Sequence, residues 1–174
     1  MTQHTAGFWH LKAGVQAHYA VEIVESAVNA DSLTLRAATK KINHRGDQLN
    51  SPVIDINIFS PADNIIGVRL EHFAEDERTY TELFPGGAPP KPTVTASKSE
   101  SSLKLVSGKI SAEVTANPYT LTFSTTGGKT LTFAGSKYQG CIQTSQPSAV
   151  LTFVQGSSTF LPNGLLLLRR ISLR

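Results

Sequence analysis

Residues 52–73 read PVIDINIFSPADNIIGVRLEHF, and this stretch decides the predicted fold. Its isoleucines at 54, 56 and 58 alternate with Asp55 and Asn57, which places apolar side chains on one face of a strand and polar ones on the other. The segment 61–64, Pro-Ala-Asp-Asn, is typical of a tight turn. We therefore predict two antiparallel strands, 52–59 and 65–73, with one face of each on a core.

Short apolar runs separated by turn residues continue along the rest of the chain. Windows of about 12 residues do not show the i, i+3, i+4 spacing of an amphipathic helix. Turn signals at 29–31, 107–108, 117–118 and 126–128 are too close together for crossover helices. The prediction is an all-β antiparallel β-sandwich, with further strands at Ala20–Glu25, Ser32–Ala37, Ser102–Val106, Lys109–Thr115, Tyr119–Ser124, Thr130–Phe133 and Val150–Phe153.

The composition favours one cytoplasmic domain. The chain has 174 residues, 40% of them hydrophobic and 17% charged, which suits a single core. The lone cysteine, Cys141, cannot form an internal disulfide, and no Asn-x-Ser/Thr sequon occurs. No signal-peptide pattern opens the chain, and the four leucines at 165–168 fall far short of the ~20 residues that span a bilayer. We expect no membrane partner.

Charge is unevenly distributed between the two halves of the sequence. Residues 1–90 carry 7 basic and 11 acidic residues, whereas residues 91–174 carry 9 and 2. The lysines of the second half are spread singly among Ser and Thr, which favours solvated strands over a nucleic-acid groove; they are Lys91, Lys98, Lys104, Lys109, Lys129 and Lys137.

The residues that could carry chemistry do not form a recognisable motif. The five histidines lack metal-ligand spacing, so no metal or cofactor site is predicted. Residues 75–77, Glu-Asp-Glu, could supply the two carboxylates that glycoside hydrolysis needs, but next to Arg78 they indicate a solvated turn. We expect His72 to continue the core-facing alternation of its strand. The histidines are His4, His10, His18, His44 and His72, and the carboxylates are Glu75, Asp76 and Glu77.

Other candidates are a thiol, a set of aromatic residues and one loop. Cys141 has no local base, so a buried structural thiol is expected. The proline- and glycine-rich segment 85–92 is predicted to be a linker, the alternative being a loop that reaches a neighbour. The aromatic side chains could stack on a sugar or pack in the core; these are Phe8, Trp9, Tyr19, Tyr80 and Tyr119.

The segment 59–73, with its turn and its Arg-x-Glu-His-Phe ending, resembles the N-terminal domain of glycoside hydrolase family 31, in the α-xylosidase and α-glucosidase branch. The opening residues 7–9, the strands at 20–37 and the paired strands at 107–114 and 119–123 extend the resemblance to residues 7–143. It implies a galactose-mutarotase-like β-sandwich over 1–143, followed by an atypical tail over 144–174.

The resemblance also implies a function. In the family the catalytic aspartates lie on a (β/α)8 barrel that this chain does not include, so no catalytic residue is assigned. We expect a non-catalytic domain of carbohydrate metabolism that packs on the barrel and is not an enzyme alone. The alternative function is a stand-alone carbohydrate-binding module. A third hypothesis is a sugar epimerase, which would need an acid and a base placed beside the substrate. Whether the chain forms a homo-oligomer is left open by the sequence.

Overall fold

The computed structural model describes residues 11, 13–71, 90–135, 137–144, 150–154 and 165–168. These residues are almost entirely β-structure, with one short 3-10 helix, η1 (Arg45–Gln48), among them. The strands are β1 (Val15–Tyr19), β2 (Glu22–Val28), β3 (Ser32–Ala38), β4 (Val53–Ala62), β5 (Ile65–Glu71), β6 (Val94–Lys98), β7 (Ser102–Ser107), β8 (Ile110–Ala116), β9 (Tyr119–Thr125), β10 (Thr130–Ala134), β11 (Gln139–Thr144), β12 (Val150–Val154) and β13 (Leu165–Leu168).

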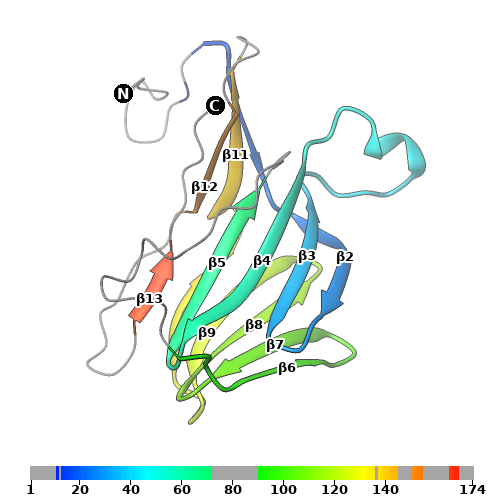
Figure 1. Cartoon of the computed structure of the whole chain (residues 1–174). Coiled ribbons are helices and arrows are strands. Elements are labelled where there is room, and N and C mark those ends of the chain that lie inside the picture. Colours follow the sequence, from blue (N-terminus) through cyan, green and yellow to red (C-terminus); the bar gives the residue numbers. More distant parts are fainter. Residues whose placement is uncertain are drawn as a thin grey trace.

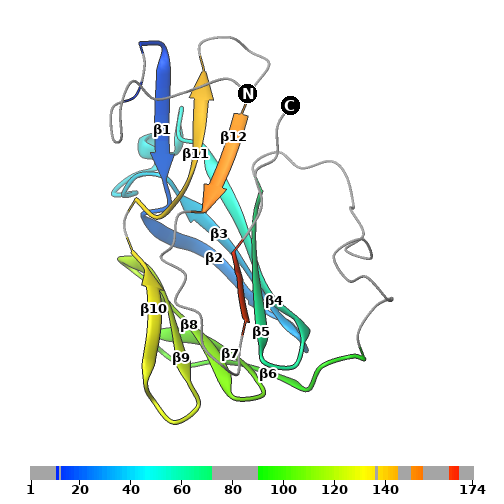
Figure 2. The same ribbon diagram turned by 90° about the vertical axis from the view of Figure 1, so that its left-hand side faces the viewer.

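Two five-stranded sheets face each other and form a β-sandwich (Figure 1). One sheet has the order β13-β5-β4-β3-β2, and the other has the order β10-β9-β8-β7-β6. A third sheet, β1-β11-β12, stands at one end of the sandwich (Figure 2). The predicted all-β sandwich is confirmed.

One pair of strands departs from the purely antiparallel arrangement that was predicted. β13 pairs with β5 in parallel, with Leu165 opposite Ile65 and Leu168 opposite Val68. Every other pair recorded in the described strands is antiparallel. A parallel partner cannot be reached through a tight turn, and β13 is separated from β5 by most of the second half of the chain. Turn signals therefore could not indicate this pairing.

The core lies between the inner faces of the two large sheets. The predicted alternation in β4 is confirmed, because Ile54, Ile56 and Ile58 are each 0% exposed whereas Asp55 points to solvent. The opposite sheet contributes side chains of the same kind from β7, β8 and β9. Its buried members are Leu103, Leu105, Ile110, Ala112, Val114, Tyr119, Leu121 and Phe123. Burial of these apolar surfaces is the main favourable term in folding.

Polar contacts join the two sheets at one end of the sandwich. The side-chain oxygen Oδ1 of Asn64, in the β4–β5 turn, accepts a hydrogen bond from the backbone N–H of Lys109 at 2.7 Å. The hydroxyl oxygens of Ser60 and Ser107 lie 2.8 Å apart. Gly108, with φ +56°, leaves no room for a Cβ beside Asn64. The turn residues that the sequence indicated thus also hold the layers together.

Most predicted strands are present, and four strands are absent from the predicted set. They are β1, β6, β11 and β13. None of the four has a sustained apolar alternation, and β1 and β11 pair with each other across most of the chain. The predicted strand 65–73 is confirmed as far as Glu71. His72 and Phe73 lie outside the described residues, as do residues 85–89 of the predicted linker.

Candidate functional site

The described carboxylates do not converge on an enclosed pocket. Asp55 and Glu71 are register neighbours on the outer face of the β2–β5 sheet, but each has an arginine partner. Nε of Arg36 lies 3.0 Å from Oδ1 of Asp55, and Arg69 forms an ion pair with Glu71. The sequence candidates Glu75, Asp76 and Glu77 lie outside the described residues.

The most buried carboxylate has a structural role. Glu22, 8% exposed, accepts a hydrogen bond at 2.7 Å from the backbone N–H of Ile42. This bond anchors the loop between β3 and β4, which extends away from the sheets (Figure 1). Because its carboxylate oxygen accepts this backbone hydrogen bond, Glu22 has a structural role in holding the loop and not a catalytic one.

Two of the five histidines lie within the described residues. His44 caps η1, because its Nδ1 accepts a hydrogen bond from the N–H of Gly46 at 3.2 Å. Its Nε2 lies 3.4 Å from Oδ1 of Asp47. His18 lies in β1 directly opposite Cys141 in β11, a register that the sequence separation of the two residues concealed. His4, His10 and His72 lie outside the described residues.

The pairing of His18 with Cys141 does not activate the thiol. Cys141 is 1% exposed, and loss of hydration raises its pKa to about 11. A nucleophilic cysteine needs the opposite shift, because the thiolate is the reactive form. The expected role of Cys141 as a buried structural thiol is therefore supported by its surroundings.

Burial of Cys141 predicts a pH-dependent stability. In the unfolded chain the thiol ionises near its ordinary pKa of 9.0, whereas in the folded chain it stays protonated to about 11. Unfolding therefore releases a proton in this window, and the free energy of unfolding falls as the pH rises through it. Urea unfolding followed by circular dichroism should show a shallower decline in Cys141→Ala than in the original chain.

The comparison between these two proteins isolates the thiol. Tyr119, whose pKa is also raised by burial, contributes a decline of the same sign, but it is present in both. Equal declines in the original chain and in Cys141→Ala would contradict the prediction.

Of the five aromatic candidates, one lies in the core, one is half-buried and three lie outside the described residues. Tyr119, 2% exposed, is a core residue whose hydroxyl donates to Oε1 of Gln139, so it is not part of a sugar-stacking surface. Tyr19 is half-buried in β1. Phe8, Trp9 and Tyr80 lie outside the described residues. The structure adds Phe133, 57% exposed beside Tyr138, which the sequence had placed only within a strand.

The described surface includes two shallow hollows. The larger, about 360 Å³, lies where β2 approaches the β6–β7 turn and is lined by Glu25, Lys98 and several serines. Glu25 is paired with Arg36, and Lys98 lies 3.4 Å from the hydroxyl of Ser26. The smaller hollow, about 270 Å³, is lined by Asp31, Ser32, Asn57, Phe59 and Ser60. It is the only one of the two with an aromatic wall.

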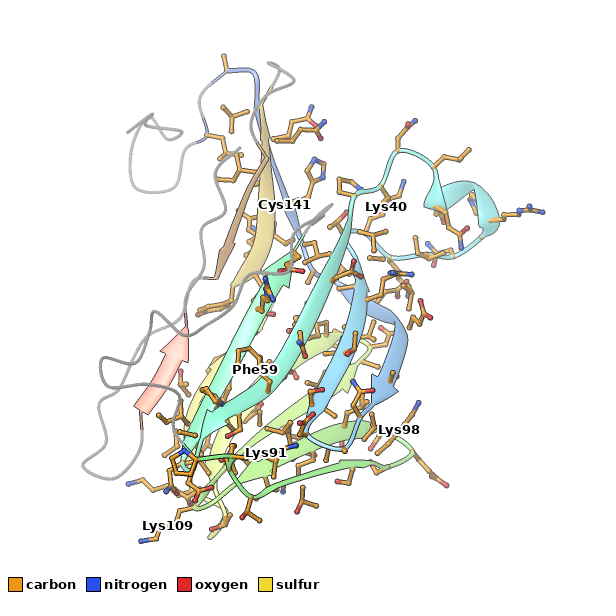
Figure 3. The ribbon with its side chains drawn as sticks, viewed as in Figure 1. Lys40, Phe59, Lys91, Lys98, Lys109 and Cys141 are labelled. Atoms are coloured by element: carbon orange, nitrogen blue, oxygen red, sulfur yellow. The ribbon has the colours of Figure 1, made fainter. Side chains whose placement is uncertain are left out.

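The described residues hold neither a metal-ligand cluster nor a membrane-spanning helix. In these ranges no three His, Cys, Asp or Glu side chains are grouped so that they could hold a metal ion. The same ranges hold no helix long and apolar enough to cross a bilayer. The lysines predicted to be solvated, including Lys91 and Lys98, are exposed, as the labelled side chains in Figure 3 show.

Two α-xylosidases are among the known proteins that are similar to this chain. An α-xylosidase of Emericella nidulans is 31% identical over 126 residues, which span 71% of this chain and 16% of the relative. The α-xylosidase XylQ of Lactiplantibacillus pentosus is 36% identical over 73 residues, which span 42% of this chain and 10% of XylQ. The chain thus spans a small part of the length of these relatives. No protein-family model matches the sequence.

Comparison with solved structures supports the fold. The cycloalternan-forming enzyme of Listeria monocytogenes, in complex with a pentasaccharide substrate, matches 79% of this chain and 11% of its own chain with a TM-score of 0.56. The uncharacterized protein lmo2446 of Listeria monocytogenes EGD-e gives the same coverage and TM-score. Both are 14% identical to this chain, so these matches concern the fold alone.

The sequence relatives agree with the resemblance that segment 59–73 indicates. The segment 59–73 resembles family 31 glycoside hydrolases. The two sequence relatives are α-xylosidases, one of which matches 71% of this chain and the other 42%. The chain is accordingly a relative of the α-xylosidases of glycoside hydrolase family 31.

Proposed function

We propose that this chain is a non-catalytic β-sandwich domain that packs on the catalytic barrel of a family 31 α-glycosidase. The observation that carries the proposal is the asymmetry of coverage: 71% of this chain matches only 16% of an α-xylosidase. The remainder of such a relative is long enough to hold a barrel with the catalytic aspartates. We further propose that residues 1–143 form this domain and that residues 144–174 are an atypical tail, whose strands β12 and β13 pair with β11 and β5. The cytoplasmic location stays a prediction.

The described carboxylates support the non-catalytic part of the proposal. Hydrolysis with retention needs two carboxyl groups about 5–5.5 Å apart on either side of a bound glycosidic bond. Asp55 and Glu71 are close in register, but they lie on an open sheet face with an arginine on each. Glu22 is occupied by the backbone of the β3–β4 loop. None of these three can flank a substrate in a closed site.

The first test is direct. The purified chain should not release the aryl group from an aryl α-xyloside or an aryl α-glucoside above the rate of a buffer blank. Turnover that co-purifies with the folded chain would overturn the proposal. Polarimetry on fresh α-glucose should likewise show no acceleration of mutarotation, because the described residues place no acid and base together for that reaction.

A hybrid enzyme tests the packing role. In the Emericella nidulans α-xylosidase, the segment that matches this chain is replaced by the chain itself, and a second version lacks the segment. We expect the hybrid to fold and turn over aryl α-xyloside, and the deletion to lose most activity because the barrel surface beneath the sandwich is exposed. A deletion as active as the parent would contradict a packing role.

A further inference from the structure

The outer edge of β5 depends on β13 for its cover. β5 has β4 on one side and β13 on the other, and β13 is the last strand of this sheet (Figure 1). The two strands are joined through four residue pairs, from Leu165 opposite Ile65 to Leu168 opposite Val68. Without β13, the backbone N–H and C=O groups on this side of β5 would form an open sheet edge.

The other edges of the two large sheets carry features that discourage strand addition. β2 has a register shift after Ile23, β10 has one after Thr130, and β6 ends on Lys98. Bulges and edge lysines are the usual means by which a sheet edge avoids pairing with another strand. The stretch of β5 that β13 covers, Ile-Ile-Gly-Val at 65–68, contains no charged residue and no proline. It is therefore the edge best suited to accept a strand.

The surroundings of β5 set the chemistry of the strand that fits. Ile66 and Val68 belong to the core and are 0% and 3% exposed, so a charge placed beside them would lose its hydration. Every second residue of the added strand must bond β5 through its backbone N–H, which excludes proline at those positions. The edge thus takes an extended apolar segment of four residues that runs parallel with β5.

Residues 165–168 can reach such an edge from the same chain or from another. A hairpin partner such as β4 is fixed by its tight turn, whereas a parallel partner arrives through a longer connection. Ten residues, 155–164, separate β13 from β12, and an extended segment of that length spans up to about 35 Å. Exchange of β13 between two copies makes the same residue pairs as pairing within one copy, which keeps the cost of exchange low.

We propose that the outer edge of β5 is a binding site for an extended apolar segment, filled in the monomer by residues 165–168 and in a dimer by the same residues of a second copy. Each copy of the dimer donates its β13 to β5 of the other copy, as an added strand does at any open sheet edge. The inference gives the tail a role that the packing function does not include. It does not depend on that function.

A peptide that carries the segment tests the site. The probe is fluorescein-labelled peptide 163–170, Asn-Gly-Leu-Leu-Leu-Leu-Arg-Arg, and its binding is followed by anisotropy. In the full chain, Leu166→Pro together with Leu167→Pro removes at least one N–H that faces β5, because alternate residues face it. We expect the peptide to bind this variant about tenfold more tightly than the original chain, in which the attached segment competes at a millimolar effective concentration. The same peptide with both prolines is the control and should bind neither protein.

The original chain tests the exchange between copies without any substitution. Sedimentation velocity should show a dimer whose fraction rises with chain concentration and falls when the peptide is added, because the peptide fills the edge of β5. Absent or equal binding of the peptide to the two proteins, equal binding of the control peptide, or a monomer at every concentration into the millimolar range would overturn the inference. If the double-proline variant does not fold, the sedimentation measurement decides alone. The hybrid enzyme is read by turnover, so failure of the packing role is seen separately from failure of the β5 site.

Discussion

The Ile56→Ala substitution is expected to lower the free energy of unfolding by about 2–5 kcal/mol. Ile56 is 0% exposed, and its strand β4 lies between β3 and β5 in the middle of its sheet. Neighbouring strands hold β4 in place on both sides, so the surrounding side chains cannot collapse fully into the space that the isoleucine leaves. The lost transfer free energy and the cavity therefore both contribute.

Urea unfolding monitored by circular dichroism measures this loss as a lower midpoint at unchanged slope. The control is Val24→Ala, because Val24 is 51% exposed on the edge strand β2, and its loss should be within about 0.5 kcal/mol. Similar losses in the two variants would mean that the apolar face of β4 does not form the core, and the sandwich described above would be wrong.

The second large effect is expected at Gly140, where β11 pairs with β1. A Cβ at residue 140 would overlap the backbone carbonyl oxygen of His18 and would come within 3.1 Å of the Tyr19 ring. Backbone atoms cannot move aside as the end of a flexible side chain can. We therefore expect Gly140→Ala to lower the free energy of unfolding by about 1–3 kcal/mol, as overpacked sites do.

Hydrogen exchange shows where the strain of Gly140→Ala acts. Amides of β1 and β11 should exchange faster, while those of β3 and β4 keep their relative protection. Gly127→Ala is the matched control, since the nearest atom to its added Cβ would be Oγ1 of Thr125 at 3.8 Å, an ordinary contact. If Gly127→Ala were as destabilising as Gly140→Ala, the close approach of β1 to β11 would not be the cause.

The strands that could be predicted are those whose own side chains alternate. β4 and β5 were predicted because each carries a row of apolar residues at every second position, such as Ile54 and Ile56. β6 and β11 carry weaker patterns, VTASK and QGCIQT. They become strands because a neighbour offers backbone hydrogen-bonding groups in register, and this is a property of the assembled sheet rather than of the local sequence.

The candidate sites depended still more on the fold. The sequence put His18 and Cys141 more than a hundred positions apart, yet β1 and β11 place them opposite each other. Tyr119 could have been a surface ring or a core residue until its strand was placed with that side chain facing the opposite sheet. The smaller hollow likewise needs Ser32 and Phe59 to meet across β3 and β4.

The amino-acid sequence by itself determined the class of fold and the family, because periodicity and the 59–73 segment are local properties that residue types alone express. Only the tertiary structure decided which side chains share a surface and which thiol loses its water. These features arise from pairings between distant strands, and the free energy of such pairings comes from burial and register in the assembled molecule rather than from any one segment.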